Sequence, residues 1–242
     1  MRNIALAVCL AVCATFMLLL SQVGSVQSQI ASDQTVKSPV EIAKLIPGQQ
    51  PPVKCIEDSP ERRGEEGCTI LASRPLLGSV AKAVYWHIDR FDSLEAAKKA
   101  AGPDGVAAEA HGSVWLMTVE ARTEEHHGGH HVAWIGPLAL PAADRYSMRI
   151  ASSLLRPGTT TPVHTHPGPE VFYVVAGEQC VETPEVGHHL GAGQSYVLPA
   201  GVIHRGRVIG SGVRRALALY LYDAALPASH DLADPPPLVP CK

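Results

Sequence analysis

The decisive stretch of this sequence is bounded by two short segments. The first reads Gly158-Thr-Thr-Thr-Pro-Val-His164-Thr-His166-Pro-Gly-Pro-Glu170, and the second reads Gly193-Gln-Ser-Tyr-Val-Leu-Pro199-Ala-Gly201-Val-Ile-His204. His164 and His166 are two residues apart, so both imidazoles leave the same face of an extended strand. Glu170 opens a run of β-branched and aromatic residues, and His204 follows a Pro-x-Gly turn that we expect to belong to a different strand pair. Three histidines and one glutamate predict a site for one divalent transition metal: Fe, Mn, Zn, Ni or Cu.

The same residues carry a resemblance to the cupin superfamily. Its first motif, G-x5-H-x-H-x3-E-x6-G, is matched by Gly158, His164, His166, Glu170 and Gly177. Its second motif, G-x5-P-x-G-x2-H-x3-N, is matched by Gly193, Pro199, Gly201 and His204, with Val208 in place of the final Asn. That Asn is not a ligand in the family. The resemblance covers residues 145–222 and implies an all-β fold, the cupin double-stranded β-helix or jelly-roll barrel, with His164, His166, Glu170 and His204 as metal ligands.

The resemblance also implies a range of functions. Cupins with this ligand set include dioxygenases, oxalate-degrading enzymes and isomerases, so we expect a metal-dependent enzyme with oxidoreductase chemistry on a small organic molecule. The alternatives are a non-catalytic module that binds or senses a metal or small ligand, and a purely structural metal. Phe172 and Tyr196 are candidate pocket residues, but no catalytic acid or base can be named.

The alternation of residues along one predicted strand and the net charge of the chain restrict the kinds of partner molecule that we expect. In Glu170–Val175 one face carries Glu170, Phe172 and Val174, and the other is apolar, so a second sheet or a second subunit of a homodimer should cover it. The net charge of −3 shows no footprint for nucleic acid. Four arginines follow the last ligand, and we interpret them as surface charge, with recognition of a substrate carboxylate as the alternative: Arg205, Arg207, Arg214 and Arg215.

The N-terminus predicts export. Arg2 and the apolar run Ile4–Leu20 indicate a signal peptide over residues 1–28, with a short membrane anchor as the alternative. No second run is long enough to span a membrane, so the cleaved protein is expected to be periplasmic or secreted. Cleavage leaves four cysteines and three possible pairings. We favour Cys55–Cys68, which closes a short loop, together with Cys180–Cys241; the alternative leaves Cys180 as a free thiol near the metal.

The remaining segments lie before and after the core motifs of the predicted barrel. Residues 29–75 are expected to be a linker and N-terminal extension, residues 76–228 the barrel domain with extra N-terminal strands, and residues 229–242 a Pro-rich tail. In the front half, Asp92-Ser-Leu-Glu95 predicts a capping box for the one helix, Leu94–Ala101. This half is either a degenerate second barrel half or additional strands. Four histidines within residues 126–131 are interpreted as a solvated hairpin tip, with a weak metal-loading site as the alternative.

Overall fold

The computed structural model describes residues 51–57, 64–77, 83–121 and 128–242. Contacts between residues divide the chain into two compact units, Met1–Gly48 and Gln49–Lys242, and all of the described residues belong to the second unit. The predicted signal peptide, residues 29–50 of the predicted linker, and His126 and His127 lie outside the described residues. Within the described ranges, no helix is long and apolar enough to cross a membrane.

The described residues form strands and one short helix. In chain order these are β1 (Cys55–Glu57), β2 (Gly67–Pro75), β3 (Val84–Phe91), α3 (Leu94–Ala100), β4 (Val106–Ala110), β5 (Ser113–Glu120), β6 (His130–Leu138), β7 (Tyr146–Leu155), β8 (His164–Thr165), β9 (Glu170–Ala176), β10 (Glu178–Glu182), β11 (Gly187–Leu190), β12 (Ser195–Leu198), β13 (Arg205–Ile209), β14 (Arg214–Asp223) and β15 (His230–Asp231). The fold is all-β, as the sequence predicts.

Helix α3 begins at Leu94, as predicted, and ends one residue before the predicted Ala101, but the capping box names the wrong N-cap residue. Ser93, not Asp92, is the N-cap: its backbone is extended, and its hydroxyl accepts a hydrogen bond from the Ala96 backbone N–H at 3.2 Å. Asp92 therefore lies outside the cap. The acceptor must lie three residues before the donor at the first helical turn, and Ser93 meets that spacing with Ala96.

The central layer is a six-stranded sheet in the order β1-β2-β7-β14-β9-β12. Strands β7 and β14 pair antiparallel along ten residues each, from Tyr146 opposite Asp223 to Leu155 opposite Arg214. Strand β9 pairs with the other side of β14, where Glu170 lies opposite Tyr220. Residues directly opposite each other point to the same face of a sheet. Arg149, Tyr220 and Glu170 therefore form one row across the inner face.

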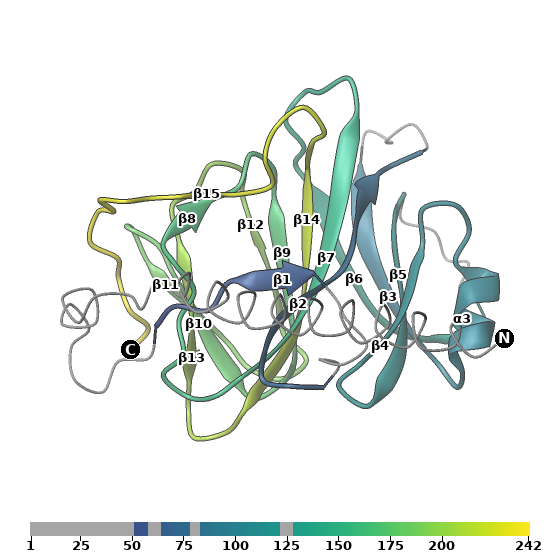
Figure 1. The fold of residues 1–242 in the computed structure, drawn as a ribbon, viewed down its shortest axis with the longest axis horizontal. Helices are drawn as coiled ribbons and strands as arrows, with labels where there is room; N and C mark the ends of the chain where they lie inside the picture. The colour runs from purple at the N-terminus through teal and green to yellow at the C-terminus, as the bar shows by residue number, and fades with distance from the viewer. Residues whose placement is uncertain (1–50, 58–63, 78–82, 122–127) are drawn as a thin grey trace, which may run out of the picture. The chain divides into compact units, whose positions relative to one another are not determined.

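Two smaller sheets close the barrel over this inner face. They are β11-β10-β13 and the pair β15-β8, and Figure 1 shows their strands on the opposite side of the central layer from α3. One end of the interior is filled by an apolar cluster from both sheets: Phe172, Val174, Val181, Leu190 and Leu198. The glycine between β9 and β10, Gly177, has φ +75° and lies so close to the β14 backbone that a Cβ would fall 2.8 Å from the Arg214 Cα. This turn requires glycine.

The front half of the domain is a separate four-stranded sheet. Its order is β4-β5-β3-β6, and it packs on the outer face of the central layer through one large core that includes Trp86, Ile88, Ile150 and Leu219. Tyr173 and Val175, on the second apolar face of β9, pack against this core. The chain's own sheet therefore covers that face, and no second subunit is needed for it.

The prediction that the histidine tract at residues 126–131 forms the tip of a hairpin is wrong. Strands β5 and β6 do not pair with each other, because both pair with β3 from opposite sides.

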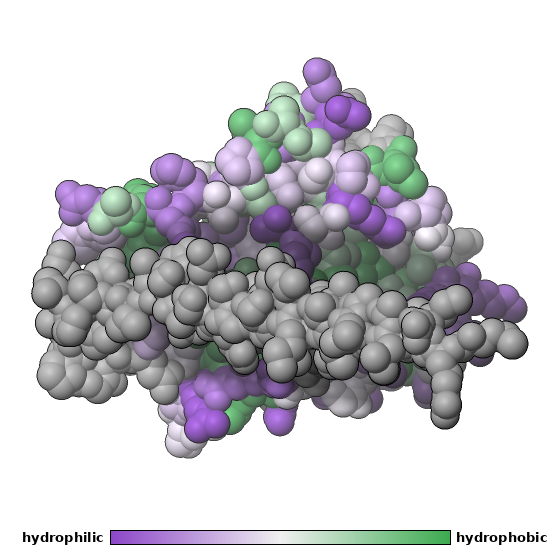
Figure 2. All heavy atoms as spheres, viewed as in Figure 1, coloured by the Kyte–Doolittle hydropathy of each residue, from purple (hydrophilic) through white to green (hydrophobic). Residues whose placement is uncertain are grey.

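On the face seen in Figure 2, the described residues place hydrophilic side chains along the upper edge with separate hydrophobic ones between them.

Both favoured disulfides are formed. Cys55 bonds to Cys68 and ties β1 to β2, and Cys180 bonds to Cys241. Cys180 is therefore not a free thiol. The tail that Cys241 anchors is also held by backbone hydrogen bonds, from Leu232 N–H to Val163 O at 2.9 Å and from Val239 N–H to Thr183 O at 2.8 Å. The Pro-rich tail thus lies across the barrel and forms part of its wall.

Candidate metal centre

The structure brings His164, His166, Glu170 and His204 together. Each offers one ligand atom, and these atoms all lie within 4.8 Å of one another. His204 lies directly opposite His164, and the two exchange backbone N–H···O bonds of 3.0 Å in both directions. The sequence predicts that His204 lies in a different strand pair from His164. This prediction is wrong, because the two residues pair with each other. This backbone pairing fixes the separation of the two rings, whose centroids lie 4.2 Å apart.

Each imidazole is oriented by a carbonyl oxygen at its Nδ1. His164 Nδ1 lies 2.8 Å from Pro162 O, His166 Nδ1 lies 2.6 Å from Ala228 O, and His204 Nδ1 lies 3.0 Å from Val202 O. A carbonyl oxygen only accepts, so each Nδ1 carries the proton and donates. Each neutral ring then leaves its Nε2 with a free lone pair, which is the state that a metal ligand requires.

The three Nε2 atoms point into a shared space beside the Glu170 carboxylate. His204 Nε2 lies 2.8 Å and His166 Nε2 lies 3.3 Å from Glu170 Oε2. Among the described residues, His166 Nε2, His204 Nε2 and Glu170 Oε2 are buried and nevertheless make no contact with hydrogen-bond geometry. Buried polar atoms are almost always satisfied. Their orphaned state, together with three nitrogen donors and one carboxylate, fits a transition metal ion bound between them.

The electrostatics agree with a ligand set. Burial, followed by the neighbouring His204, lowers the pKa of His164 to about 4, so its ring is neutral at neutral pH. Burial opposes ionisation of Glu170, but His166 and His204 hold the pKa of this carboxyl well below its usual range. Burial alone would lower the pKa of His166, and the Glu170 carboxylate raises it instead. The site therefore holds an ionised carboxylate in a buried setting, where it attracts a cation.

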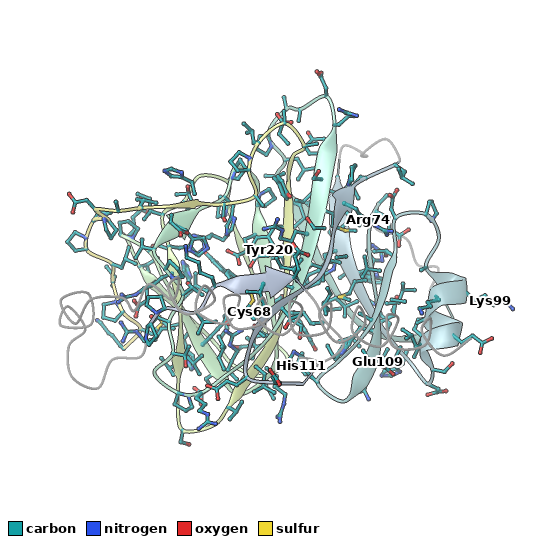
Figure 3. All side chains as sticks on the ribbon, in the orientation of Figure 1. Cys68, Arg74, Lys99, Glu109, His111 and Tyr220 are labelled. Atoms are coloured by element: carbon teal, nitrogen blue, oxygen red, sulfur yellow. A yellow bond between two sulfur atoms is a disulfide. The ribbon has the colours of Figure 1, made fainter. Side chains whose placement is uncertain are left out.

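Tyr220 is a member of the site that the sequence did not reveal. It projects from β14 in the central sheet (Figure 3), its ring lies 4.6 Å from that of His166, and its hydroxyl interacts with the Glu170 carboxylate. Burial, then the Glu170 carboxylate, raises the pKa of Tyr220 well above its usual value. The phenol thus keeps its proton and orients the carboxylate. Its signal was the alternation of β14, which places residue 220 on the inner face only once the register with Glu170 is known.

The four residues open onto a cavity of about 330 Å³. Phe172 lines this cavity, as expected, but Tyr196 does not. Tyr196 lies one strand further out, where its ring stacks on His188 at 4.1 Å and its hydroxyl lies 2.9 Å from His188 Nε2. Alternation along the strand predicts that Tyr196 lies on the inner face. It does not predict how far Tyr196 lies from the candidate ligands, because that distance depends on which strand lies at the sheet edge.

The arginines after the last ligand divide into two groups. Arg205 and Arg207 hold the buried carboxylate of Glu182, with Nε–O distances of 2.5 and 2.6 Å. Arg215 is exposed, but Arg214 is only 7% exposed and lines the cavity. The interpretation as surface charge is therefore wrong for Arg214. Alternation along β14 turns one of two adjacent arginines inward, and the sequence alone does not say which.

The other histidines lie elsewhere. His130 is exposed, and His131 Nδ1 lies 3.2 Å from the buried Asp89 carboxylate, so the described part of the tract is tied to β3 rather than to a metal cluster. His111, at φ +54°, donates from Nε2 to Ala216 O at 3.2 Å. Because that nitrogen carries a proton, His111 does not act as a base toward Ser152, whose Oγ lies 3.1 Å away.

Comparison with known proteins agrees with this fold. The family model described as "Cupin domain" matches residues 152–220, and this part of the chain is a cupin domain. No curated protein matches the sequence.

Solved structures with a similar fold include three proteins of different description. They are a cupin-like protein from Thermotoga maritima (18% identity, 36% of this chain and 64% of that one, TM-score 0.32), an oxalate oxidase in complex with glycolate (23%, 36% and 46%, 0.31) and a DMSP lyase from Ruegeria pomeroyi (24%, 34% and 42%, 0.30). The chain covers less than two thirds of the length of each.

Proposed function

We propose that this protein is an exported, metal-dependent cupin enzyme with oxidoreductase chemistry on a small organic molecule. The observation that carries the proposal is the set of three imidazole Nε2 atoms and one carboxylate, converging within 4.8 Å at the wall of a cavity. His164, His166, Glu170 and His204 would hold the ion. A transition metal bound there supplies Lewis acidity and, where it is redox-active, an electron-transfer centre.

The residues around the ligands support an enzyme over a passive binding module. A cavity lined only by apolar groups would offer nothing to position or protonate a substrate. Here the Tyr220 phenol keeps its proton beside Glu170, and polar side chains such as Gln179 and Arg214 line the same space. Gln179 and Arg214 can therefore donate hydrogen bonds to bound oxygen atoms, while Phe172 limits the space on one side.

The disulfides support export. Two bonds, Cys55–Cys68 and Cys180–Cys241, are formed in the folded domain. Such bonds persist in oxidising compartments and are rare in the cytosol. A periplasmic or secreted protein with a cleaved signal peptide over residues 1–28 agrees with both bonds.

Metal analysis of the purified mature protein tests the ligand set. Elemental analysis should find close to one transition metal per chain, and His166→Ala should lose it. His189→Ala is the matched control, because His189 pairs with the exposed Glu178 on the surface. Metal retained in His166→Ala would refute the ligand assignment.

Oxygen uptake by the metal-loaded protein, screened over small organic acids and alcohols, then tests the reaction. A metal-loaded protein that binds these compounds but turns none over is a binding module.

A further inference from the structure

The cavity contains buried hydrogen-bond donors that have no acceptor. Within the part of the chain that the structure describes, Arg149 Nε, Gln179 Nε2 and Arg214 Nε are buried and unpaired. All three residues line the cavity beside the candidate metal centre. Buried donors are normally satisfied, by protein, water or a ligand. A cavity whose unmet groups are donors favours an occupant rich in acceptor oxygens.

Arg214 is the strongest of these signals. Its side chain is 7% exposed, and its Nη1 donates to Ser153 Oγ at 2.7 Å. Burial lowers the pKa of Arg214 to about 10, so the guanidinium remains charged at neutral pH. No carboxylate of the described residues forms an ion pair with it, although a buried charge normally requires one. Arg205 and Arg207 show the contrast, because both are neutralised by Glu182.

The register places Arg214 at the far end of the cavity from the metal ligands. Tyr220 lies opposite Glu170, and Arg214 is six residues earlier on the same strand, so the two backbones are about 20 Å apart at 3.3 Å per residue, although the Arg214 guanidinium still interacts electrostatically with Glu170 and Tyr220. The Arg214 side chain shortens this span, because it bonds to Ser153, which lies opposite Ala216. Between the two ends, Ala151 and Ala218 face each other and leave the sheet surface free of large side chains.

Gln179 lies at the same end as Arg214. The β9–β10 turn brings Gly177 against the Arg214 backbone, where a Cβ would lie 2.8 Å from the Arg214 Cα. Gln179 follows two residues later and is only 2% exposed. A guanidinium fork and an amide N–H group thus approach one end of the cavity from two different sheets.

We propose that the cavity binds an elongated organic carboxylate, with the carboxylate held by Arg214 and Gln179 and the opposite end of the molecule at the metal centre. A planar carboxylate matches the fork of a guanidinium, which can donate two parallel hydrogen bonds. The metal-side half of this inference rests on the proposed function, and the Arg214 half does not. The substrate class is therefore a small organic acid of several carbons.

Calorimetric titration of the full mature chain tests the site. Glutarate is the probe, pentane-1,5-diol is its uncharged counterpart, and both are titrated into metal-loaded and chelator-treated protein. We expect glutarate to bind, the diol to bind at least about tenfold more weakly, and Arg214→Gln to weaken glutarate by about tenfold or more. Arg215→Gln is the matched control: it is the next residue on β14, it is exposed, and it should bind glutarate like the wild type.

Each outcome decides the inference. Equal binding of the diol and glutarate, unchanged binding in Arg214→Gln, or no binding of glutarate to either protein form would overturn it. Inorganic phosphate that competes as strongly as glutarate would overturn the assignment to a carboxylate.

Two further points keep the test decisive. If Arg214→Gln does not fold, Gln179→Met and Ser153→Ala take its place, and each should weaken glutarate severalfold. Arg214-dependent binding of glutarate in a protein that takes up no transition metal in the elemental analysis would leave the anion site standing and remove the proposed metal function. Metal binding without Arg214-dependent glutarate binding would remove this inference alone.

Discussion

At the scale of single residues, the inner face of the central sheet carries groups that would be costly in an ordinary core. Glu170 is 3% exposed, and Tyr220 and Arg149 lie in the same row across β9, β14 and β7. A buried carboxylate is stable only when it is paired or bound to a cation. The phenol of Tyr220 interacts with the ionised carboxylate, and in the proposed function the three Nε2 atoms would share that carboxylate with a metal ion. Tyr220 would then act on the metal through Glu170.

Removal of the Tyr220 hydroxyl should weaken metal binding without abolishing it. In Tyr220→Phe the Glu170 carboxylate loses a donor that orients it, and loss of such a partner typically lowers metal affinity by about tenfold or more. Competition with a chromogenic chelator measures the change. Tyr222→Phe, two residues along β14 and outside the cavity lining, should match the wild type. Equal affinities in Tyr220→Phe and the wild type would show that the phenol does not support the ligand.

At the scale of elements, the four-stranded front sheet supports the strands that carry the ligands. Trp86 of β3 is fully buried in the core between the two sheets, which also contains Val171, the residue after Glu170. The front sheet contributes no ligand. Its role is to bury the outer face of β7, β14 and β9, so that these strands keep a fixed register.

Trp86→Ala should therefore destabilise the whole domain. Truncation of a buried tryptophan in such a core costs about 3–5 kcal/mol of unfolding free energy. Urea unfolding of the metal-free protein, followed by circular dichroism, measures this cost. Lys99→Ala on the exposed face of α3 is the control and should change the unfolding free energy by less than about 0.5 kcal/mol. A loss of only that size in Trp86→Ala would show that the front sheet is not coupled to the barrel.

The C-terminal tail is a second supporting element, and its disulfide should affect the metal. Ala228, whose carbonyl orients His166, directly precedes the tail, and the tail is bonded through Cys241 to Cys180, 61 residues away in sequence. The double variant Cys180→Ala/Cys241→Ala should lose about 4 kcal/mol of unfolding free energy on the loop-entropy model. It should also bind metal more weakly, because His166 loses part of its orientation.

The other disulfide provides the comparison. Cys55→Ala/Cys68→Ala opens a loop with a sequence separation of 13, for which the same model gives about 3 kcal/mol. Both cysteines line the same cavity as the candidate ligands, but neither lies in the segment that carries Ala228, whose carbonyl orients His166. Its metal affinity, measured by chelator competition, should equal that of the wild type. A larger loss of affinity in this variant than in Cys180→Ala/Cys241→Ala would contradict the role of the tail.

At the scale of the whole molecule, the sequence predicts the parts of the fold that depend on local patterns. The apolar runs and the Gly and Pro turns beside them predict strands at Tyr146–Leu155 and Ser195–Leu198, and these match β7 and β12 to the residue. The cysteine count predicts two disulfides and the short loop favours Cys55–Cys68, but the count alone leaves three pairings, and the structure selects the favoured one. The grouping of His164, His166, Glu170 and His204 could be expected from motif spacing, since that spacing encodes a short turn between paired strands.

The unpredicted features depend on contacts between segments distant in sequence. The front sheet covers β9 because Trp86 and Val171 meet across two layers, and no local pattern encodes that packing. The inward turn of Arg214 and the outward position of Tyr196 depend on sheet order, which alternation leaves open. Ala228 reaches His166 because the chain after β14 turns back to pair β15 with β8, a contact between segments distant in sequence.

Metal binding should stabilise the entire domain, because the ligands come from separate strands that unfolding disperses. Free metal at a hundred times its dissociation constant adds about 2.7 kcal/mol to the unfolding free energy, which raises the Tm by roughly 5–10 °C for a domain of this size. Scanning calorimetry of chelator-treated protein, with each candidate ion added back, measures the shift. Mg²⁺ is the control, because it prefers oxygen ligands and should leave the Tm unchanged. His166→Ala should lose most of the shift, since a neutral methyl replaces one of three nitrogen donors. A Tm that no transition metal raises, or that rises equally in His166→Ala, would separate the stability of this barrel from the four residues at its centre.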